Sequence, residues 1–367
     1  MGHVTDFVKE RISTDKLTLA NYVSTENMKS DFGGINPAIS IPNNTNVIHY
    51  KKGDVLLSNI RPYLRKVWAA NSDGGCSTDV FVFRAKSISP SFLHYIMAND
   101  TFINYVMSGA KGVKMPRGDK EQMLKYVFSI PRIEEQYKIS RLLHLLDDRI
   151  ATQNKIIEDL KKLKSAISKH LFVRKDLLET TICLSNIATL KNGYAFQSGK
   201  YNALGKWKIL TITNVPGERY INDENCNCII NLPNDIQDHQ VLKEGDILIS
   251  LTGNVGRVSL CKNGDYLLNQ RVGLLQLAKN VNREYLYQIL SSQRFENSMI
   301  ACGQGAAQMN IGKVDVESYV LPYSSNGNNI LWVAKILHSY DERIINELRR
   351  LTLLTMQKQY LLTQMFI

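Results

Sequence analysis

The stretch Lys51–Ser58 reads KKGDVLLS, and Lys243–Ser250 reads KEGDILIS, 192 residues later. In each copy a Gly-Asp turn signal leads into a run of apolar residues, which predicts a buried strand. A second repeat, DDRI at Asp147–Ile150 and DERI at Asp341–Ile344, has a spacing of 194 residues. The chain is therefore expected to contain two copies of one structural unit, related by a pseudo-twofold axis.

Length and composition fit two domains of ordinary size. The chain has 367 residues, of which 44% are hydrophobic, so each half can bury a core of its own. No run approaches the roughly 18–20 apolar residues of a membrane span. The opening residues Met1–Asp6 lack the basic and apolar regions of a secretory signal. We expect a cytoplasmic protein with no membrane partner.

The chain is basic, with a net charge of +11 and a pI of about 9.2. A basic surface attracts polyanions, and nucleic acid is the first candidate among them. Many soluble proteins are basic for colloidal reasons alone, so the charge assigns a nucleic-acid partner only together with motifs.

The six cysteines do not predict a metal site. Their one close pair is Cys226 and Cys228, whereas a zinc site usually shows two pairs with two to four residues inside each. We expect all six to be reduced thiols.

Two long helices are predicted, from about Ile133 to Phe172 and from about Asn329 to Ile367. Alternating steps of four and three residues from Ile139 reach ten positions, and eight of them are apolar. The same steps from Val333, 194 residues later, again reach eight apolar positions of ten. A heptad pattern of this length predicts a coiled coil.

The polar positions inside the two heptad patterns coincide. Gln153 corresponds to Glu347, and Lys164 corresponds to Lys358. Because a mismatched polar residue in a coiled-coil seam is costly, this agreement favours direct pairing over two amphipathic helices packed on separate domains. The connection through the second domain makes the pair antiparallel.

The remaining regions predict two mixed α/β (α+β) domains. We expect the first domain at residues 1–130, a central spacer helix at 131–172, the second domain at 173–322 and a C-terminal spacer helix at 323–367. Helices are predicted at Phe92–Val106 and Tyr285–Ile300. Strands are predicted at Val55–Leu57, Val80–Phe83, Tyr126–Ile130, Ile209–Ile212, Ile247–Ile249, Val272–Leu277 and Tyr319–Leu321.

The motifs of enzymes that act on DNA are absent from the sequence. The string Asn36–Ile39 lacks the second proline and the aromatic residue of an amino-methyltransferase motif. The glycines at Gly193 and Gly199 are one residue too far apart for a phosphate-binding loop, and Tyr201 replaces its hydroxyl ligand. No nuclease-like carboxylate cluster and no G-x-S-x-G elbow is present. We therefore expect no catalytic residue, no cofactor and no metal.

Polar loops follow the repeated strand in both halves. Arginine can bind guanine and asparagine can bind adenine in the major groove, while basic side chains also bind phosphates. A solvated turn with incidental charge would carry similar residues, so this alternative stays open for each of them. The candidate DNA-binding residues here are Asn59, Arg61, Tyr63, Arg65 and Lys66 in the first half, and Thr252, Asn254 and Arg257 in the second.

Further polar loops lie at matching places later in each half. Glycines in these loops allow the backbone to approach a ligand closely. The residues differ between the halves while the framework agrees, as expected for readers of two different half-sites. The further candidates are Lys111, Lys114 and Arg117 in the first half, and Asn269, Gln270, Arg271, Gln304 and Gln308 in the second.

These segments together resemble the specificity subunits of type I restriction–modification systems, along essentially the whole chain. KKGDVLLSNIRPYLRKVWAA with GGCSTDVFVF resembles one common type of recognition domain. NGYAFQS, GDILISLTGNVGRVSL and LLNQRVGLLQL together resemble another type. IPRIEEQYKISRLLHLLDDRI resembles the entry into a spacer helix.

The resemblance implies a non-catalytic subunit that reads a bipartite, asymmetric sequence of double-stranded DNA. The domains at 1–130 and 173–322 would be target-recognition domains, each reading one half-site. The helices would set the spacing and dock two methyltransferase subunits, which flip and methylate an adenine in each half-site. Two restriction subunits can join such a complex.

One departure and two alternatives remain. The second spacer starts with Pro322–Gly327, PYSSNG, where the family pattern has Pro-x-x-Glu-Glu-Gln, so this helix is expected to start later. A stand-alone DNA-modifying enzyme with fused recognition domains would need the missing motifs. A coiled-coil adaptor would explain the heptads but not the duplicated α/β regions.

Overall fold

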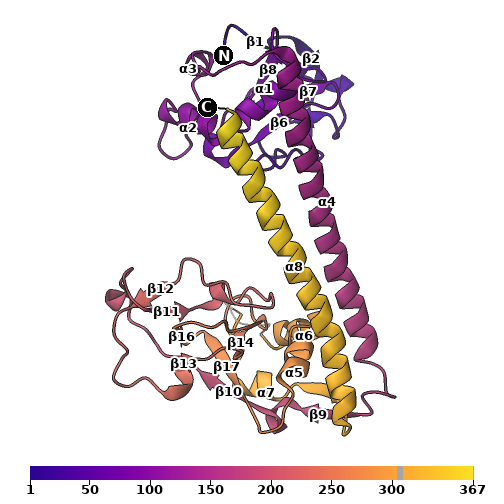
Figure 1. Cartoon of the computed structure of the whole chain (residues 1–367), viewed down its shortest axis with the longest axis vertical. Coiled ribbons are helices and arrows are strands. Elements are labelled where there is room, and N and C mark those ends of the chain that lie inside the picture. The colour runs from indigo at the N-terminus through magenta and orange to yellow at the C-terminus, as the bar shows by residue number, and fades with distance from the viewer. Residues whose placement is uncertain (304–308, 367) are drawn as a thin grey trace. The chain divides into compact units, whose positions relative to one another are not determined.

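The computed structural model describes residues 1–303 and 309–366 (Figure 1). Two compact units make up the chain. Unit 1 consists of Met1–Asn154 together with Arg349–Ile367, and unit 2 is the continuous segment Lys155–Leu348. Each unit therefore contains parts of both long helices.

Unit 1 is built on two four-stranded sheets. The first has the order β1-β8-β5-β6 and is antiparallel throughout. Its central strand β5 carries the GDVLLS repeat, and Leu56 and Leu57 there are fully buried. The strands of the first sheet are β1 (Thr5–Phe7), β5 (Val55–Ser58), β6 (Val67–Ala69) and β8 (Val80–Ala85). The second sheet, of order β2-β4-β7-β3, contains β2 (Arg11–Ser13), β3 (Tyr22–Val23), β4 (Asn46–Tyr50) and β7 (Gly74–Cys76).

Three short helices pack in unit 1: α1 (Pro90–Met97), α2 (Asp100–Ser108) and α3 (Lys120–Leu124). The segment Phe92–Val106, predicted to be helical, forms parts of two helices, because the chain breaks at Asn99. The side chain of Asn99 accepts the N–H of Thr101 and so starts α2.

The strand predicted at Tyr126–Ile130 is wrong, since no strand forms there. Tyr126 packs edge-on against Phe102, and its carbonyl accepts a hydrogen bond from the amino group of Met1. Tyr126 and Phe128 of this run pack against the core, whereas Val127 and Ile130 are exposed.

Unit 2 repeats the first sheet of unit 1. Its order β10-β17-β14-β15 matches β1-β8-β5-β6 strand for strand, and β14 carries the second copy of the repeat. These strands are β10 (Ala188–Asn192), β14 (Ile247–Ser250), β15 (Val258–Leu260) and β17 (Val272–Leu277). The other strands of unit 2 are β9 (Thr180–Cys183), β11 (Trp207–Leu210), β12 (Asn227–Ile229), β13 (Val241–Leu242), β16 (Tyr266–Leu268) and β18 (Val320–Tyr323). The strand predicted at Ile209–Ile212 stops at Leu210, where a short 3-10 turn follows.

The helices of unit 2 are α5 (Arg283–Leu290), α6 (Gln293–Cys302) and α7 (Lys313–Glu317). The predicted helix Tyr285–Ile300 is split at Ser292, whose hydroxyl accepts the N–H of Phe295. The break corresponds to the one at Asn99 in unit 1, so the repeat preserves it.

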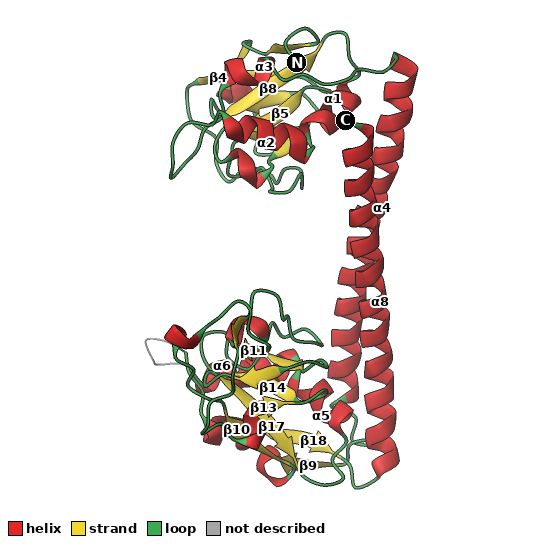
Figure 2. Cartoon of the chain, turned by 60° about the vertical axis from the view of Figure 1, so that its left-hand side comes forward, coloured by secondary structure: helices red, strands yellow, loops and turns green. Residues whose placement is uncertain are grey.

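The long helices α4 (Ile133–Leu171) and α8 (Gly327–Met365) lie side by side within each unit (Figures 1 and 2). In unit 1, Leu143 of α4 and Leu362 of α8 belong to one buried cluster. Earlier on α8, Asp341 pairs with Lys164 in unit 2. The pairing is antiparallel in both units, as the heptad pattern predicts.

The helix α8 begins later than Pro322, which belongs to β18. The side chain of Asn326 accepts the N–H of Asn328 and supports the first turn of α8. The departure from the family pattern at 322–327 therefore corresponds to a strand followed by a loop.

The predicted fold class is confirmed: the protein is mixed α/β, with two sheet-rich domains that share one sheet order and with a pair of long helices. Among the described residues, no helix combines the length and the apolar character that a membrane crossing requires. All six cysteines are free thiols.

Candidate nucleic-acid interface

Two polar loops that are about 50 residues apart in the sequence meet at the end of β5 in unit 1. The loop 59–66 contains a 3-10 turn at Pro62–Leu64, flanked by Arg61 and Arg65 in left-handed conformation (φ 50° and 54°). The N–H of Arg61 donates to the carbonyl of Pro116 at 2.8 Å, which joins this loop to the loop 109–117. The candidates of unit 1 thus share one surface.

The same arrangement recurs at the end of β14 in unit 2. The N–H of Gly253 donates to the carbonyl of Met309 at 2.9 Å, and the hydroxyl of Thr252 donates to Asn310 at 3.2 Å. The third polar segment joins them, because the N–H of Leu251 donates to the carbonyl of Arg271 at 3.0 Å. Gln304 and Gln308 lie outside the described residues.

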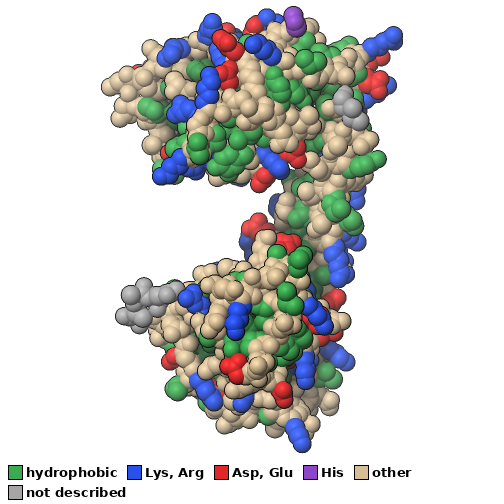
Figure 3. Space-filling view, turned by 90° about the vertical axis from the view of Figure 1, so that its left-hand side faces the viewer, with side chains coloured by type: hydrophobic (Ala, Val, Ile, Leu, Met, Phe, Trp, Pro, Cys, Tyr) green, Lys and Arg blue, Asp and Glu red, His purple; other side chains and the backbone are tan. Residues whose placement is uncertain are grey.

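Eight of the described candidate side chains are exposed to solvent. Arginine and lysine among them can bind phosphates or guanine, and asparagine or glutamine can bind adenine. They are Arg61, Tyr63, Lys111, Lys114 and Arg117 in unit 1, and Asn254, Gln270 and Arg271 in unit 2. Figure 3 shows basic side chains spread over one face of the molecule among acidic and hydrophobic ones.

The arginines that follow the repeated strand are held by acidic residues of the second short helix. In unit 1, Arg65 lies 3.2 Å from Asp100 at the start of α2. In unit 2, Arg257 lies 3.5 Å from Glu296 on α6. The geometry gives these two arginines a role in positioning their loops.

Other basic candidates of unit 1 also have partners within the protein. Lys66 donates to the carbonyl of Thr25 at 2.6 Å. Arg117 pairs with Asp79 at 3.1 Å. Lys111 pairs with Asp119 at 2.9 Å, and this bond with the charge of Asp119 raises the pKa of Lys111. All three side chains have partners within the protein, while Lys111 and Arg117 stay 83% and 55% exposed.

Asn59 and Asn269 are less accessible than a base-reading side chain would be. The Oδ1 atom of Asn59 is buried without a hydrogen-bond partner in the described structure. Asn269 is only 8% exposed, and its Oδ1 accepts the N–H of Arg271 at 3.1 Å. Asn269 supports the turn that presents Gln270 and Arg271.

Sequence reasoning did not select the aromatic residues beside this turn. The N–H of Gln270 donates to the carbonyl of Tyr194 at 3.0 Å, and the ring of Phe196 lies 4.9 Å from that of Tyr194. Both rings line a cavity of 460 Å³ together with Lys200. Aromatic and basic side chains in one recess can stack on bases and bind phosphates. Both aromatic residues belong to the string NGYAFQS, so this string was the part of the sequence that could have predicted the cavity.

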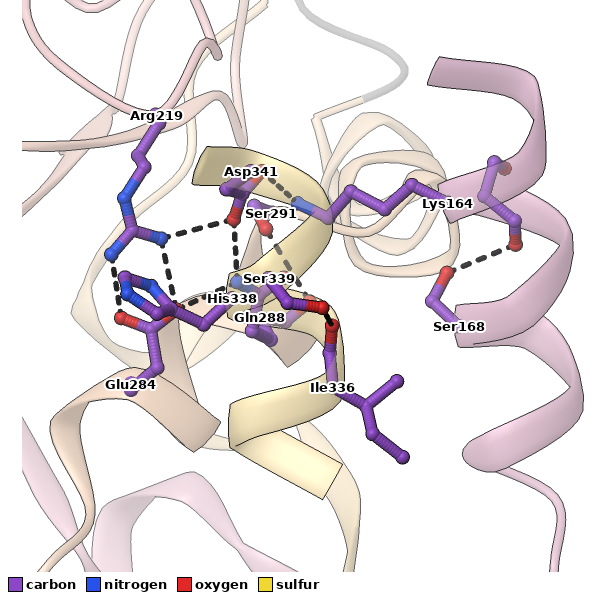
Figure 4. Close-up of polar contacts among 11 residues, drawn as sticks. Lys164, Ser168, Arg219, Glu284, Gln288, Ser291, Ile336, His338, Ser339 and Asp341 are labelled. Atoms are coloured by element: carbon purple, nitrogen blue, oxygen red, sulfur yellow. Dashed lines mark hydrogen bonds and ion pairs between the residues drawn. The ribbon is translucent and has the colours of Figure 1, made fainter. Parts of the chain in front are cut away.

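A buried polar network ties unit 2 together (Figure 4). Arg219 binds Glu284 of α5 through two hydrogen bonds of 2.9 and 2.7 Å and also donates to Asp341 of α8 at 3.0 Å. Asp341 further accepts Lys164 of α4 and Gln288 of α5, both at 2.6 Å. The network connects the loop that carries Arg219 with both long helices.

The charges in this network balance. Burial alone would raise the pKa of Glu284, but the hydrogen bonds from Arg219 and Gln288 and the charge of Arg219 lower it below its usual range. The two carboxylates, Glu284 and Asp341, face two cations, Lys164 and Arg219.

Unit 1 has a simpler counterpart. Asp147 corresponds to Asp341, and Lys358 corresponds to Lys164. Lys358 lies 2.5 Å from Asp147, whose other oxygen accepts the hydroxyl of Tyr95 at 2.8 Å. Within residues 1–303 and 309–366, no His, Cys, Asp and Glu side chains gather in a group of three or more that could hold a metal ion.

The family model of the type I restriction modification DNA specificity domain matches residues 9–162 and 179–354. This chain belongs to that family. As a type I specificity-domain protein, it is 27% identical over 245 residues to the Type I restriction enzyme MjaVIII specificity subunit of Methanocaldococcus jannaschii. It is 31% identical over 94 residues to the Type I restriction enzyme EcoDI specificity subunit of Escherichia coli.

The specificity-domain protein spans about half the length of the first of these relatives. The match covers 60% of this chain and 54% of the MjaVIII subunit, and 26% of this chain and 21% of the EcoDI subunit.

Two solved structures resemble the whole fold. A chain from work on complex assembly and conformational transition of the type I R-M system matches with a TM-score of 0.60 at 18% identity, covering 99% of this chain and 95% of that one. The S subunit from M. genitalium matches with a TM-score of 0.58 at 14% identity, covering 100% and 97%. At these identities the likeness concerns the fold alone.

Proposed function

We propose that this chain is the DNA-specificity subunit of a type I restriction–modification complex, without catalysis of its own. Each sheet-rich domain reads one half of a bipartite, asymmetric target in double-stranded DNA. The observation that carries the proposal is the recurrence of joined polar loops at the end of the same four-stranded sheet in both units.

The side chains of the two surfaces differ, which suits two different half-sites. In unit 1 the exposed candidates Arg61 and Lys114 are cationic, so they fit guanine or phosphate. In unit 2, Asn254 and Gln270 offer amides beside Arg271, and amides fit adenine. A shared framework with different reading groups is what an asymmetric target requires.

The long helices fit a role in docking methyltransferase subunits. On α8 within unit 1, Leu353, Met356 and Tyr360 are 65%, 63% and 64% exposed. Their spacings of three and four residues place them on one face of the helix. An exposed apolar stripe of this kind marks a protein interface. In the proposed complex, two methyltransferase subunits supply the chemistry, and restriction subunits can join.

The experiment is co-expression with a methyltransferase subunit encoded beside this gene, followed by mapping of methylated adenines in host DNA. A single bipartite motif is the expected result, and Arg61→Ala should then alter methylation at one half-site only. Methylation without sequence preference in an assembled complex would contradict the proposal. Methyl transfer by this chain alone would instead support a stand-alone modifying enzyme.

A further inference from the structure

The first sheets of the two units end differently at their outer edges. In unit 2 a segment of the chain continues the sheet beyond β15. The N–H of Leu260 donates to the carbonyl of Arg219 at 2.8 Å, and the N–H of Ile221 donates to the carbonyl of Leu260 at 3.0 Å. Residues 219–221 thus cover the edge of β15.

The matching edge in unit 1 is open. Ala69 of β6 lies opposite Val55, as Leu260 lies opposite Ile247. The flanking N–H of Ala70 donates to Asp54 of the chain leading into β5, so by the alternation of an antiparallel ladder the N–H and C=O of Ala69 point away from β5. Within the described residues, β6 is the last strand of its sheet, and no bridge continues beyond it.

A cavity of 580 Å³ lies where unit 2 has its covering segment. Val67, Trp68 and Ala69 of β6 line one side of it, and Asp147 of α4 lines the other. An unpaired strand edge beside a cavity is a site where another chain can add as a strand.

The acidic group in this cavity has room for another donor. In unit 2, Oδ2 of Asp341 accepts two hydrogen bonds, from Gln288 and from Arg219. In the described part of unit 1, Oδ2 of Asp147 accepts one, from the hydroxyl of Tyr95. The position that Arg219 fills on Asp341 is thus open on Asp147.

Aromatic rings surround both Arg219 in unit 2 and the cavity in unit 1. The guanidinium of Arg219 lies 5.2 Å from the ring of Tyr287 and 5.6 Å from that of Tyr220, within the range of cation–π attraction. The cavity of unit 1 is lined by the rings of Phe32, Trp68, Tyr95 and Tyr137.

Basic groups also line the cavity and affect its preference. Arg141 and His144 lie on its wall, and the charge of Arg141 weakens the attraction for a cation. His94 does not add to them at neutral pH, because burial lowers its pKa to about 4. One carboxylate and several aromatic rings therefore determine which ligand the cavity binds. Unit 2 has a second carboxylate, Glu284, at the position that corresponds to Ser91.

We propose that the open edge of β6 and the cavity beside it bind an extended peptide segment of a partner protein that carries an arginine. The peptide backbone pairs with the N–H and C=O of Ala69, and the guanidinium binds Asp147 between the aromatic rings. Residues 219–221 are the internal example of this mode of binding. The site begins directly after the polar loop 59–66, and the N–H of Phe32 on its wall donates to the carbonyl of Arg65 in that loop at 2.9 Å.

The test uses the full-length chain and a fluorescently labelled peptide copied from its own residues Val215–Asp223, VPGERYIND, read by anisotropy. Saturable binding is expected, and the peptide with alanine in place of arginine should bind at least ten-fold more weakly. Ala69→Pro removes the edge N–H and should weaken binding at least ten-fold. The matched control Ala69→Thr keeps that N–H and should change binding less than two-fold.

A gain of affinity provides a second measurement. Ser91→Glu rebuilds the carboxylate that Glu284 supplies in unit 2, so it should tighten binding of the arginine peptide at least three-fold and leave the alanine peptide unchanged. Absence of saturation up to millimolar peptide, or equal binding of both peptides, would overturn the proposal. If Ala69→Pro does not fold, the Ser91→Glu variant tests the proposal alone, by whether it tightens binding of the arginine peptide and leaves the alanine peptide unchanged.

Discussion

Replacing Asp341 by asparagine should destabilise unit 2 far more than the equivalent change Asp147→Asn destabilises unit 1. The carboxylate of Asp341 is 8% exposed and neutralises Lys164 and Arg219, which are 18% and 8% exposed. Without its charge, two enclosed cations face Glu284 alone. Asp147 is 33% exposed and pairs with the single cation Lys358.

The magnitudes differ because the burial differs. Removing one partner of a buried ion pair costs about 3–5 kcal/mol, and asparagine keeps one acceptor, so we expect the lower end, about 3 kcal/mol. Because the pair of Asp147 and Lys358 is more accessible, Asp147→Asn should lower the free energy of unfolding by about 1 kcal/mol or less, as for surface ion pairs. With a urea slope of about 2 kcal/mol/M, the midpoint for unit 2 should fall by about 1.5 M in Asp341→Asn.

Tryptophan fluorescence can follow the two units separately. Trp207 and Trp332 lie in unit 2 and Trp68 lies in unit 1, so a Trp68→Phe background reports on unit 2 alone. Adding Lys164→Met to Asp341→Asn should recover part of the loss, because it removes one unpaired cation. An Asp341→Asn shift no larger than that of Asp147→Asn would refute the reasoning.

Three further outcomes are expected. Arg61→Ala should weaken specific DNA binding of the assembled complex by about 1–3 kcal/mol in a filter or anisotropy assay, whereas Arg65→Ala should first lower the melting temperature of unit 1. Inserting seven residues near Ile157 and near Leu351 keeps the heptad register and lengthens each helix by about 10 Å. The spacer of the methylated motif should then grow by about three base pairs, and an unchanged spacer would contradict the role of the helices in setting it. Because the pKa of His94 falls from 6.5 to about 4 on folding, the unfolded chain binds a proton there that the folded chain does not. Unit 1 should lose stability as the pH drops from about 6.5 towards 4, and urea titrations of His94→Phe should show a flatter dependence.

The parts of the fold that follow from local periodicity were predictable. Strands β5 and β14 follow the repeated runs that begin with Gly-Asp, and α4 starts at the predicted Ile133, two residues after Pro131. The breaks at Asn99 and Ser292 were missed, since each is decided by one capping side chain inside an otherwise helical pattern.

The candidate site was predictable as loops but not as individual contacts. The two loops of each unit follow the repeat and were chosen from it. The ion pairs of Arg65 with Asp100 and of Arg257 with Glu296 join residues about 35–40 positions apart, and no local pattern announces them. The network around Arg219 depends on residues of three separate helices, which only the folded chain brings together.

The core of unit 1 joins residues from distant parts of the sequence, whereas unit 2 is one continuous segment. Asn99 donates to the carbonyl of Leu362, and the ring of Phe92 packs against that of Phe366. Unit 1 therefore cannot complete its core until Arg349–Ile367 has been synthesised and has docked. Until then, apolar side chains of α1 and α4 stay exposed to chaperones and proteases.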